Sequence, residues 1–237
     1  MAKEEAKSAK TKTGKLKAKL LDTYYGHPAK DMKLILISGA SDKVEVANFV
    51  HEILKSAGQP VAILASEQEI KVGALHKFLS TAWKAGSNYC VITAPDASLK
   101  NDTFYGLPVH VAALTNSSSS RDEQILFKMN PKYVVINRDD ANFEDFSNFA
   151  GSEGTILYGN DRSAHIAILR SKVYKYGTEA SLSIGNNSFT VASFLTGENT
   201  VSNMAAAAAI ADALHITPEI ISEGIANYDP ENLSETK

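Results

Sequence analysis

The sequence predicts an α/β fold: a mostly parallel sheet flanked by helices, with a small antiparallel β section near residues 164–195. Two observations support this prediction. From Lys33 onward, short runs rich in leucine and β-branched residues alternate with stretches whose apolar residues recur at helical spacing, as in strands joined by helices. After residue 164, the runs at 164–174 and 181–195 alternate in a way that suits antiparallel strands, with Gly185-Asn186-Asn187 as a turn within the second run.

The local pattern assigns the elements in order. Buried strands are expected at residues 33–37, 61–64, 89–93, 110–114, 133–137 and 155–158. Helices are expected at residues 42–57, 71–85, 121–129 and 201–214, with one or two further turns at 142–149. A last helix follows Thr217, which can serve as its N-cap because Pro218 then occupies the first helical position.

The composition, 44% hydrophobic and 22% charged residues, is that of an ordinary soluble globular protein. No run of about 18 apolar residues occurs, so a membrane span is not expected. The single cysteine, Cys90, excludes an internal disulfide and a cysteine-based zinc site, and its place in an apolar run predicts a small buried side chain. These features favour a cytoplasmic protein.

Charge divides the chain unevenly. Residues 1–19 carry seven lysines and two glutamates, 7 − 2 = +5, which leaves −8 for the remainder of a chain with net charge −3. We therefore predict a basic tail at 1–21, mobile or loosely helical, one α/β domain at 22–230 and a C-terminal tail at 231–237. Nucleic-acid binding is not the expected role, because it would require aromatic side chains beside the lysines and Tyr24-Tyr25 alone supply little.

The loop at residues 38–44, Ser-Gly-Ala-Ser-Asp-Lys-Val, stands between the first strand and the first helix of the sheet. Phosphate-binding loops in this position place a glycine before the lysine, so that backbone N–H groups reach phosphate, and a Ser or Thr after it to hold Mg²⁺. Here Asp42 precedes Lys43 and Val44 follows it. The strand-loop-helix expected of a nucleotide-binding site is present, but the glycine before the lysine and the hydroxyl after it are replaced.

Four segments in the same order resemble the central, ATP-binding domain of the Mur ligases, most closely the UDP-N-acetylmuramyl-tripeptide synthetase branch. The first is Tyr-Gly-His-Pro-Ala-Lys-Asp-Met-Lys-Leu-Ile at 25–35, which leads to the loop at 38–44. The others are Ala-Leu-Thr-Asn at 113–116, Asn-Arg-Asp-Asp at 137–140, and Gly-Glu-Asn-Thr-Val-Ser-Asn at 197–203. The resemblance covers about residues 22–230.

This resemblance implies ATP-dependent amide ligation, in which a substrate carboxylate is phosphorylated and the acyl phosphate is attacked by an amine. ATP and Mg²⁺ are the implied cofactors, although Asp42 and Val44 argue against both. The matching positions that would contact nucleotide are Gly39, Ser41, Lys43, Asn116, Asp139 and Asn203.

Three of these positions also have a purely structural interpretation. Lys43 can be a solvated charge in a first helical turn, Asp139 can cap the next segment, and Asn203 can hold a strand-to-helix junction.

Other positions depart from the family pattern. Thr93 stands where the family carries a metal-binding glutamate, and the serines at 117–120 replace a segment that contains a metal-binding His and leads to a carbamylated lysine. The serine run is expected to be a flexible loop. The six histidines lack ligand spacing, so we assign no metal-binding residue and no catalytic residue.

Three hypotheses follow. The first is a homologue that has lost ligation and survives as a binding or interaction scaffold. The second is the nucleotide-binding part of an ATP-dependent amide ligase of cell-wall peptide synthesis, completed by partner chains, because we recognise neither a UDP-binding domain before residue 22 nor a ligase domain after residue 230. The third is binding of nucleic acid or an anionic surface through the basic tail, which would fail if deleting residues 1–19 left salt-sensitive retention on a polyanion unchanged.

Overall fold

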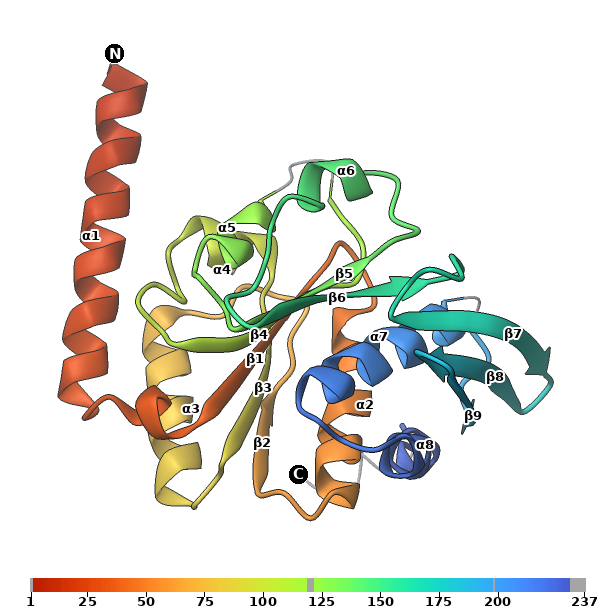
Figure 1. Cartoon of the computed structure of the whole chain (residues 1–237). Helices are drawn as coiled ribbons and strands as arrows, with labels where there is room; N and C mark the ends of the chain where they lie inside the picture. Colours follow the sequence, from red (N-terminus) through yellow and green to blue (C-terminus); the bar gives the residue numbers. More distant parts are fainter. Residues whose placement is uncertain (1, 119–121, 198, 231–237) are drawn as a thin grey trace.

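A computed structural model describes residues 2–118, 122–197 and 199–230, with side chains from residue 13 onward. The segment at 119–121, part of the predicted serine loop, lies outside the described residues, as do Glu198 and the C-terminal segment 231–237. A nine-stranded sheet in the order β2-β3-β1-β4-β5-β6-β7-β8-β9 organises the fold (Figure 1). This arrangement confirms the predicted α/β class.

The first seven strands are parallel, and the last two pair antiparallel to their neighbours. The strands are β1 (Lys33–Ser38), β2 (Val61–Leu64), β3 (Tyr89–Thr93), β4 (Val109–Leu114), β5 (Tyr133–Asn137), β6 (Gly154–Gly159), β7 (Ile166–Tyr174), β8 (Gly177–Ile184) and β9 (Asn187–Ser193). The predicted antiparallel section is confirmed, with Gly185 and Asn186 between β8 and β9. The prediction missed the first half of β8.

Helices connect and cover the strands. They are α1 (Ala2–Tyr24), a 3₁₀ turn η1 (Pro28–Asp31), α2 (Lys43–Ser56), α3 (Val72–Lys84), α4 (Asp96–Lys100), α5 (Gln124–Phe127), α6 (Phe143–Phe146), α7 (Thr200–Ala213) and α8 (Pro218–Asn227). In the part of the chain that the structure describes, no helix is both long and apolar enough to cross a membrane. The helix α1 runs through residue 21, so the predicted boundary at 21/22 falls inside it, and the division into tail and domain stays a prediction.

Some boundaries differ from the expected ones. The helix expected at 121–129 is the short α5, and the chain turns away at Asn130, which has a left-handed backbone with φ 57°. The helix expected at 142–149 is the single turn α6, and α4 was not expected. Thr217 occupies the predicted N-cap position of α8 with extended backbone but makes no capping hydrogen bond through its side chain.

The sheet separates two apolar cores, as the alternation of strand side chains requires. Ile35 and Ile37 of β1 face α2, α7 and α8, whereas Leu34 and Leu36 face the α3 side. Cys90 is buried in the second core, which confirms its predicted role as a small apolar side chain, and burial raises the pKa of its thiol to about 12. Burial on both faces explains why the strands appear in the sequence as continuous apolar runs.

Candidate functional site

The loop at 38–44 lies where β1 meets α2, at the carboxyl edge of the sheet. In open parallel sheets this edge is where ligands bind, because the connecting loops of neighbouring strands converge there. The ends of β1 and β4 are adjacent in register, with Ser38 opposite Leu114, so Thr115 and Asn116 lie against the loop. The structure thus brings together segments about 75 residues apart in the chain.

Gly39 is required by this close approach. A Cβ at Gly39 would lie 2.0 Å from Thr115 Oγ1 and 2.8 Å from Asn116 Oδ1. A larger residue would push the loop away from β4. The glycine that the sequence matched to a phosphate-binding loop therefore fits the loop against the neighbouring strand in this chain.

Backbone N–H groups of the loop donate to protein oxygens. The Ala40 N–H donates to the Asn116 carbonyl at 3.1 Å, and the Ser41 N–H donates to Asn116 Oδ1 at 3.0 Å. The Lys43 N–H donates to the Ser41 carbonyl at 2.8 Å. Asn116 Nδ2 also donates to Ser41 Oγ at 2.7 Å. These groups, which a phosphate-binding loop directs at its ligand, are engaged within the protein.

Asp42 directs its carboxylate across the loop. Its backbone is left-handed with φ 65°, and Oδ2 accepts hydrogen bonds from Ser41 Oγ at 2.7 Å and from Asn199 Nδ2 at 2.9 Å. A polar cavity of about 140 Å³ lies here, lined by Asp42, Thr115, Asn116, Asn137, Asn199, Ser202 and Asn203. Asp42 therefore brings a negative charge into the space between the loop and the start of α7.

Lys43 points elsewhere. Its side chain is buried, its ammonium forms an ion pair with Glu67 in the β2–α3 connection, and it does not line the cavity beside Asp42. The structural alternative of a solvated lysine is thus wrong for Lys43, because the chain supplies a carboxylate partner in a sparsely hydrated position.

The start of α7 is tied to α2. Asn203 Nδ2 donates to Glu45 Oε1 at 3.0 Å, and Asn203 is almost fully buried. Burial raises the pKa of Glu45, while the hydrogen bond from Asn203 lowers it. Asn203 therefore joins two helices in this structure, α7 and α2, and not a strand to a helix as its structural interpretation expected.

Asp139 lies at the end of β5 and holds the turn after β6. Its Oδ2 accepts hydrogen bonds from the backbone N–H and from Nδ2 of Asn160, both at 2.8 Å. The neighbouring Asp140 accepts from the Ser117 N–H at 2.6 Å and from the Asn142 N–H at 2.8 Å. Both carboxylates serve loop structure, but Asp139 does not cap the next segment as the structural alternative expected, because its partner Asn160 follows β6 and it is Asp140 that contacts Asn142.

Of the six predicted nucleotide positions, the structure gathers Gly39, Ser41, Asn116 and Asn203 around the loop, with Lys43 turned toward Glu67. Their role toward nucleotide stays a prediction. Sequence reasoning missed Asn199 and Glu67, the partners of Asp42 and Lys43. Asn199 stood within the motif at 197–203, but nothing in the local pattern indicated that its amide would meet Asp42.

At the end of β3, the Thr93 hydroxyl is also engaged in hydrogen bonds within the protein. Thr93 Oγ1 accepts from the Ser66 N–H and donates to the Ser66 carbonyl, both at 2.8 Å. Among the described residues, no group of three or more His, Cys, Asp and Glu side chains lies close enough to hold a metal ion.

These observations define an α/β domain with a strand-loop-helix at the carboxyl edge of a parallel sheet. The family model of the Mur ligase middle domain matches residues 37–211. The chain belongs to the Mur ligase middle domain family, as the sequence motifs predicted.

Curated relatives agree with this assignment. The UDP-N-acetylmuramoyl-L-alanyl-D-glutamate–2,6-diaminopimelate ligase of Bacillus licheniformis is 25% identical, over 88% of this chain and 49% of the relative. The ligase of the same name from Clostridium botulinum is 26% identical, over 76% of this chain and 42% of the relative. This chain thus spans about half the length of the curated relatives it matches.

Solved structures show the same fold. A 2,6-diaminopimelate ligase structure of the same name superposes with a TM-score of 0.81 at 19% identity, over 93% of this chain and 50% of that one. The folylpolyglutamate synthase of Mycobacterium tuberculosis, complexed with ADP and AMPPCP, gives a TM-score of 0.74 at 13% identity, over 91% of this chain and 63% of that one. At these identities the likeness establishes architecture alone.

Proposed function

We propose that this chain is a Mur ligase middle-domain homologue that does not perform ATP-driven ligation and acts as a binding or interaction scaffold. The observation that carries the proposal is that the polar groups of the loop at 38–44 are bonded to other groups of the protein. Three of its N–H groups, the Lys43 ammonium and the Asp42 carboxylate are all engaged with other groups of the protein. A nucleotide would have to displace several of these contacts at once.

Electrostatics opposes nucleotide binding at this loop. Two like unit charges at 4 Å repel by about 4 kcal/mol at the effective dielectric constant of a protein surface. That energy corresponds to about three orders of magnitude in affinity, since 1.4 kcal/mol is a factor of ten. The Asp42 carboxylate, held by Asn199, would impose such a repulsion on a phosphate group beside the loop.

Size and ligand chemistry point the same way. Pockets for small molecules and cofactors usually enclose at least about 300 Å³, and the cavity beside Asp42 has about 140 Å³. Val44 has no hydroxyl for Mg²⁺, and Thr93 uses its own hydroxyl to hold Ser66. The residues present do not fit Mg·ATP.

Titration calorimetry of the full chain with Mg·ATP tests the proposal. We expect no binding tighter than about 1 mM, which corresponds to 4.1 kcal/mol of binding free energy. The double variant Asp42→Gly/Val44→Thr should bind at least tenfold more tightly than the wild type, because it removes the repulsion and supplies a hydroxyl.

Lys43→Ala is the matched control for any binding that is observed. Micromolar affinity of the wild type that disappears in Lys43→Ala would sink the proposal. It would favour instead the nucleotide-binding part of a ligase, completed by partner domains.

A further inference from the structure

The strands β7, β8 and β9 form one end of the sheet and have two unlike faces. Side chains on one face, including Ala180, Leu182 and Val191, are buried in the core that contains α7 and α8. The opposite face carries three cross-strand rows, set by the register of the strands, and most of its side chains are exposed. The rows are Arg170–Ser181–Thr190, then Lys172–Glu179–Ala192, then Tyr174–Gly177 with Phe194 just beyond β9.

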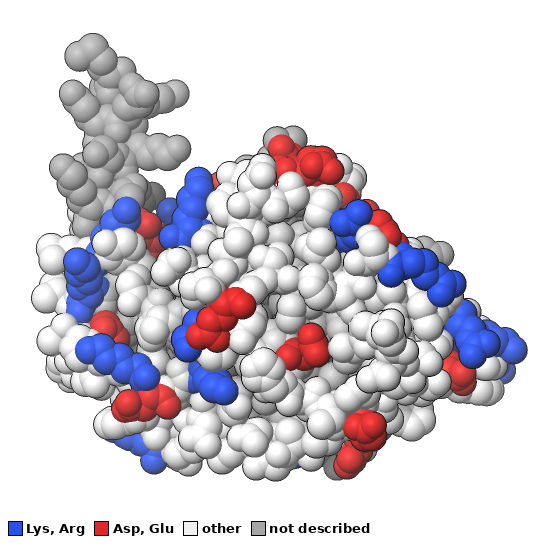
Figure 2. All heavy atoms as spheres, viewed as in Figure 1, with Lys and Arg blue, Asp and Glu red and all other residues white. Residues whose placement is uncertain are grey.

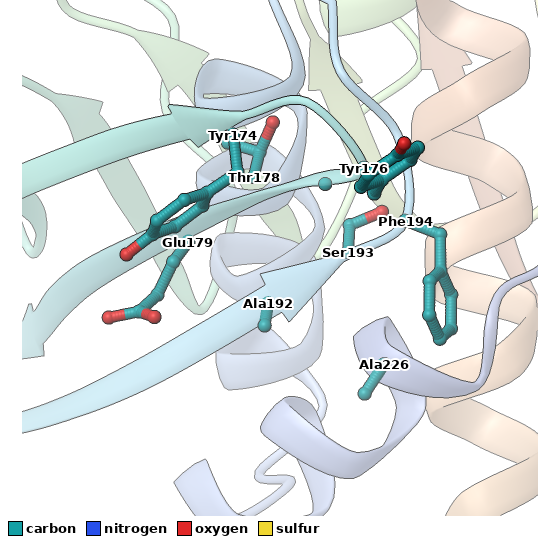
Figure 3. Close-up of a pocket in the computed structure, with 9 residues that line it drawn as sticks. Tyr174, Tyr176, Thr178, Glu179, Ala192, Ser193, Phe194 and Ala226 are labelled. Carbon is teal, nitrogen blue, oxygen red and sulfur yellow. The ribbon is translucent and has the colours of Figure 1, made fainter.

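Aromatic side chains surround a hollow at the last of these rows (Figure 3). The hollow has about 320 Å³, with Tyr174, Tyr176 and Phe194 at its sides and small residues such as Gly177 and Ala192 between them. Ala226 of α8 also lines it, so the hollow lies at the end of the strands, between the outer face and that helix. Tyr176 is 75% exposed and Phe194 66%. Of the eight large apolar side chains that are exposed in the described part of the chain, three line this hollow.

A second hollow of about 410 Å³ continues from the first along the same strands. The two share Tyr174 and Glu179, and the second extends past Lys172 to Arg170. The face therefore presents two neighbouring hollows, one aromatic and one basic, with Tyr174 and Glu179 between them. Because a strand rises about 3.4 Å per residue, Arg170 and Tyr174, four residues apart on β7, are about 14 Å apart.

Basic groups outnumber acidic ones on this face. Arg170, Lys172 and Lys175 carry positive charge, and Glu179 is the acidic side chain among the residues that line the two hollows. Lys172 Nζ lies 4.8 Å from the ring centroid of Tyr174, and Lys175 Nζ lies 5.0 Å from that of Tyr176. Figure 2 shows basic side chains over the right-hand end of the molecule, where Figure 1 places β7 and β8.

We propose that the outer face of β7–β9 binds an acidic polypeptide segment that carries an aromatic or large aliphatic side chain. The apolar side chain enters the 320 Å³ hollow, and carboxylates about 7 and about 14 Å away pair with Lys172 and Arg170, respectively. This inference rests on the proposed scaffold function, for which it names the surface and the chemistry of the partner. Exposed aromatic residues and arginine are the residue types enriched at protein interfaces.

The geometry favours a polypeptide over single-stranded nucleic acid. Glu179 occupies the middle row, between the basic and aromatic ends. A peptide can place an uncharged residue beside Glu179 and its carboxylates beside the basic side chains, whereas the regularly spaced phosphates of a nucleic acid backbone would meet Glu179 and be repelled. The small residues between the rings leave a hollow that suits an inserted side chain rather than a continuous platform for stacked bases.

Selection of displayed random 12-residue peptides on the full chain tests the inference. We expect enriched peptides to combine Asp or Glu with a large apolar residue about four positions away. Labelled synthetic copies of the enriched peptides should lose at least tenfold in affinity, measured by fluorescence anisotropy, with Phe194→Ser and with Lys172→Glu. Trp83→Ser and Lys84→Glu are matched controls, because both residues are exposed on α3, and they should leave binding within twofold.

Other outcomes overturn the inference. One is enrichment of no peptide class, or of peptides whose binding ignores Phe194→Ser and Lys172→Glu. Another is binding of a 20-nucleotide oligodeoxythymidine that these two variants abolish while no acidic peptide binds. A third is self-association in sedimentation equilibrium that Phe194→Ser abolishes, which would make a second copy the occupant. Micromolar Mg·ATP binding would refute the proposed loss of nucleotide binding, but it would not contradict peptide binding at the outer face of β7–β9. Failure of the proposed function and failure of this inference are therefore distinguishable.

Discussion

His76 is a buried residue without the partners that its chemistry calls for. It lies on α3 with no exposed surface, and neither ring nitrogen has a hydrogen-bond partner among the described residues. Burial lowers its pKa, and the negative charge of Asp22 on α1 partly opposes this effect. The Asp22 carboxylate is itself engaged, since its Oδ2 pairs with His27 Nδ1 at 2.6 Å. An imidazolium at position 76 is therefore poorly accommodated.

The sign of the resulting pH dependence follows from proton linkage. With a native pKa below the unfolded value of about 6.5, the unfolded chain binds more protons as the pH falls past that value, so the free energy of unfolding decreases. Urea unfolding at pH 7.5 and 5.5 should show a larger decrease for the wild type than for His76→Leu. The difference should not exceed about 1.4 kcal/mol per pH unit, the limit for one proton.

His215→Asn is the control for this measurement, because His215 is exposed and asparagine tolerates its left-handed backbone with φ 61°. It should keep the pH slope of the wild type. Equal slopes for the wild type and His76→Leu would contradict the assignment.

Gly224 of α8 packs directly against the backbone of α2. It makes the closest contact of any helical glycine among the described residues. A Cβ added at Gly224 would lie 2.3 Å from the Ile53 Cα, which is a backbone atom and cannot move alone. Glycine is thus present because two helix backbones approach closely, although the sequence pattern of α8 shows only a gap in an apolar stripe. Tyr228 packs its ring edge-on against Phe49 at 5.1 Å and extends the same contact.

Gly224→Ala should lower the free energy of unfolding by about 1–3 kcal/mol, the usual cost of overpacking a core. Gly73→Ala offers a matched helical glycine, since no atom lies within 4 Å of its added Cβ. That substitution should be neutral or stabilising by up to about 1 kcal/mol, because alanine favours helix. Chemical denaturation of both variants checks the pair, and equal effects would refute the packing argument.

For the whole molecule, the remaining question is how α1 relates to the α/β domain. Ala18 is fully buried, and the ammonium groups of Lys15 and Lys19 lie 5.0 and 5.7 Å from the ring centroid of Tyr105. Leu16 and Leu20 on the same helix are about 60% exposed. The end of α1 therefore contacts the domain through one side, and most of the apolar core lies elsewhere.

Deletion of residues 1–21 should leave one cooperative unfolding transition, because both core clusters lie almost wholly within residues 22–230. The lost contacts of α1, worth about 1–2 kcal/mol, should lower Tm by roughly 2–8 °C for a domain of this size. Scanning calorimetry measures both quantities. Loss of cooperative unfolding would show that α1 is integral to the domain and that the predicted division is wrong.

The sequence by itself determined the order of the strands and of the longer helices after residue 33, the α/β class and the family, because periodicity, turn residues and motif order are local properties of the chain. It also located the departures at Asp42, Val44 and Thr93. Only the tertiary structure decided what those departures do. The partners of Asp42 and Lys43 are Asn199 and Glu67, 157 and 24 residues away.

The outer face of β7–β9 likewise arises from strand register, which places Lys172 beside Glu179 and Tyr174 beside Gly177. Local patterns could indicate that strands would form there, but not which side chains would share a row. Contacts between distant segments depend on strand order and helix packing, which no local period encodes, and so the sites of this protein are settled by its folded state.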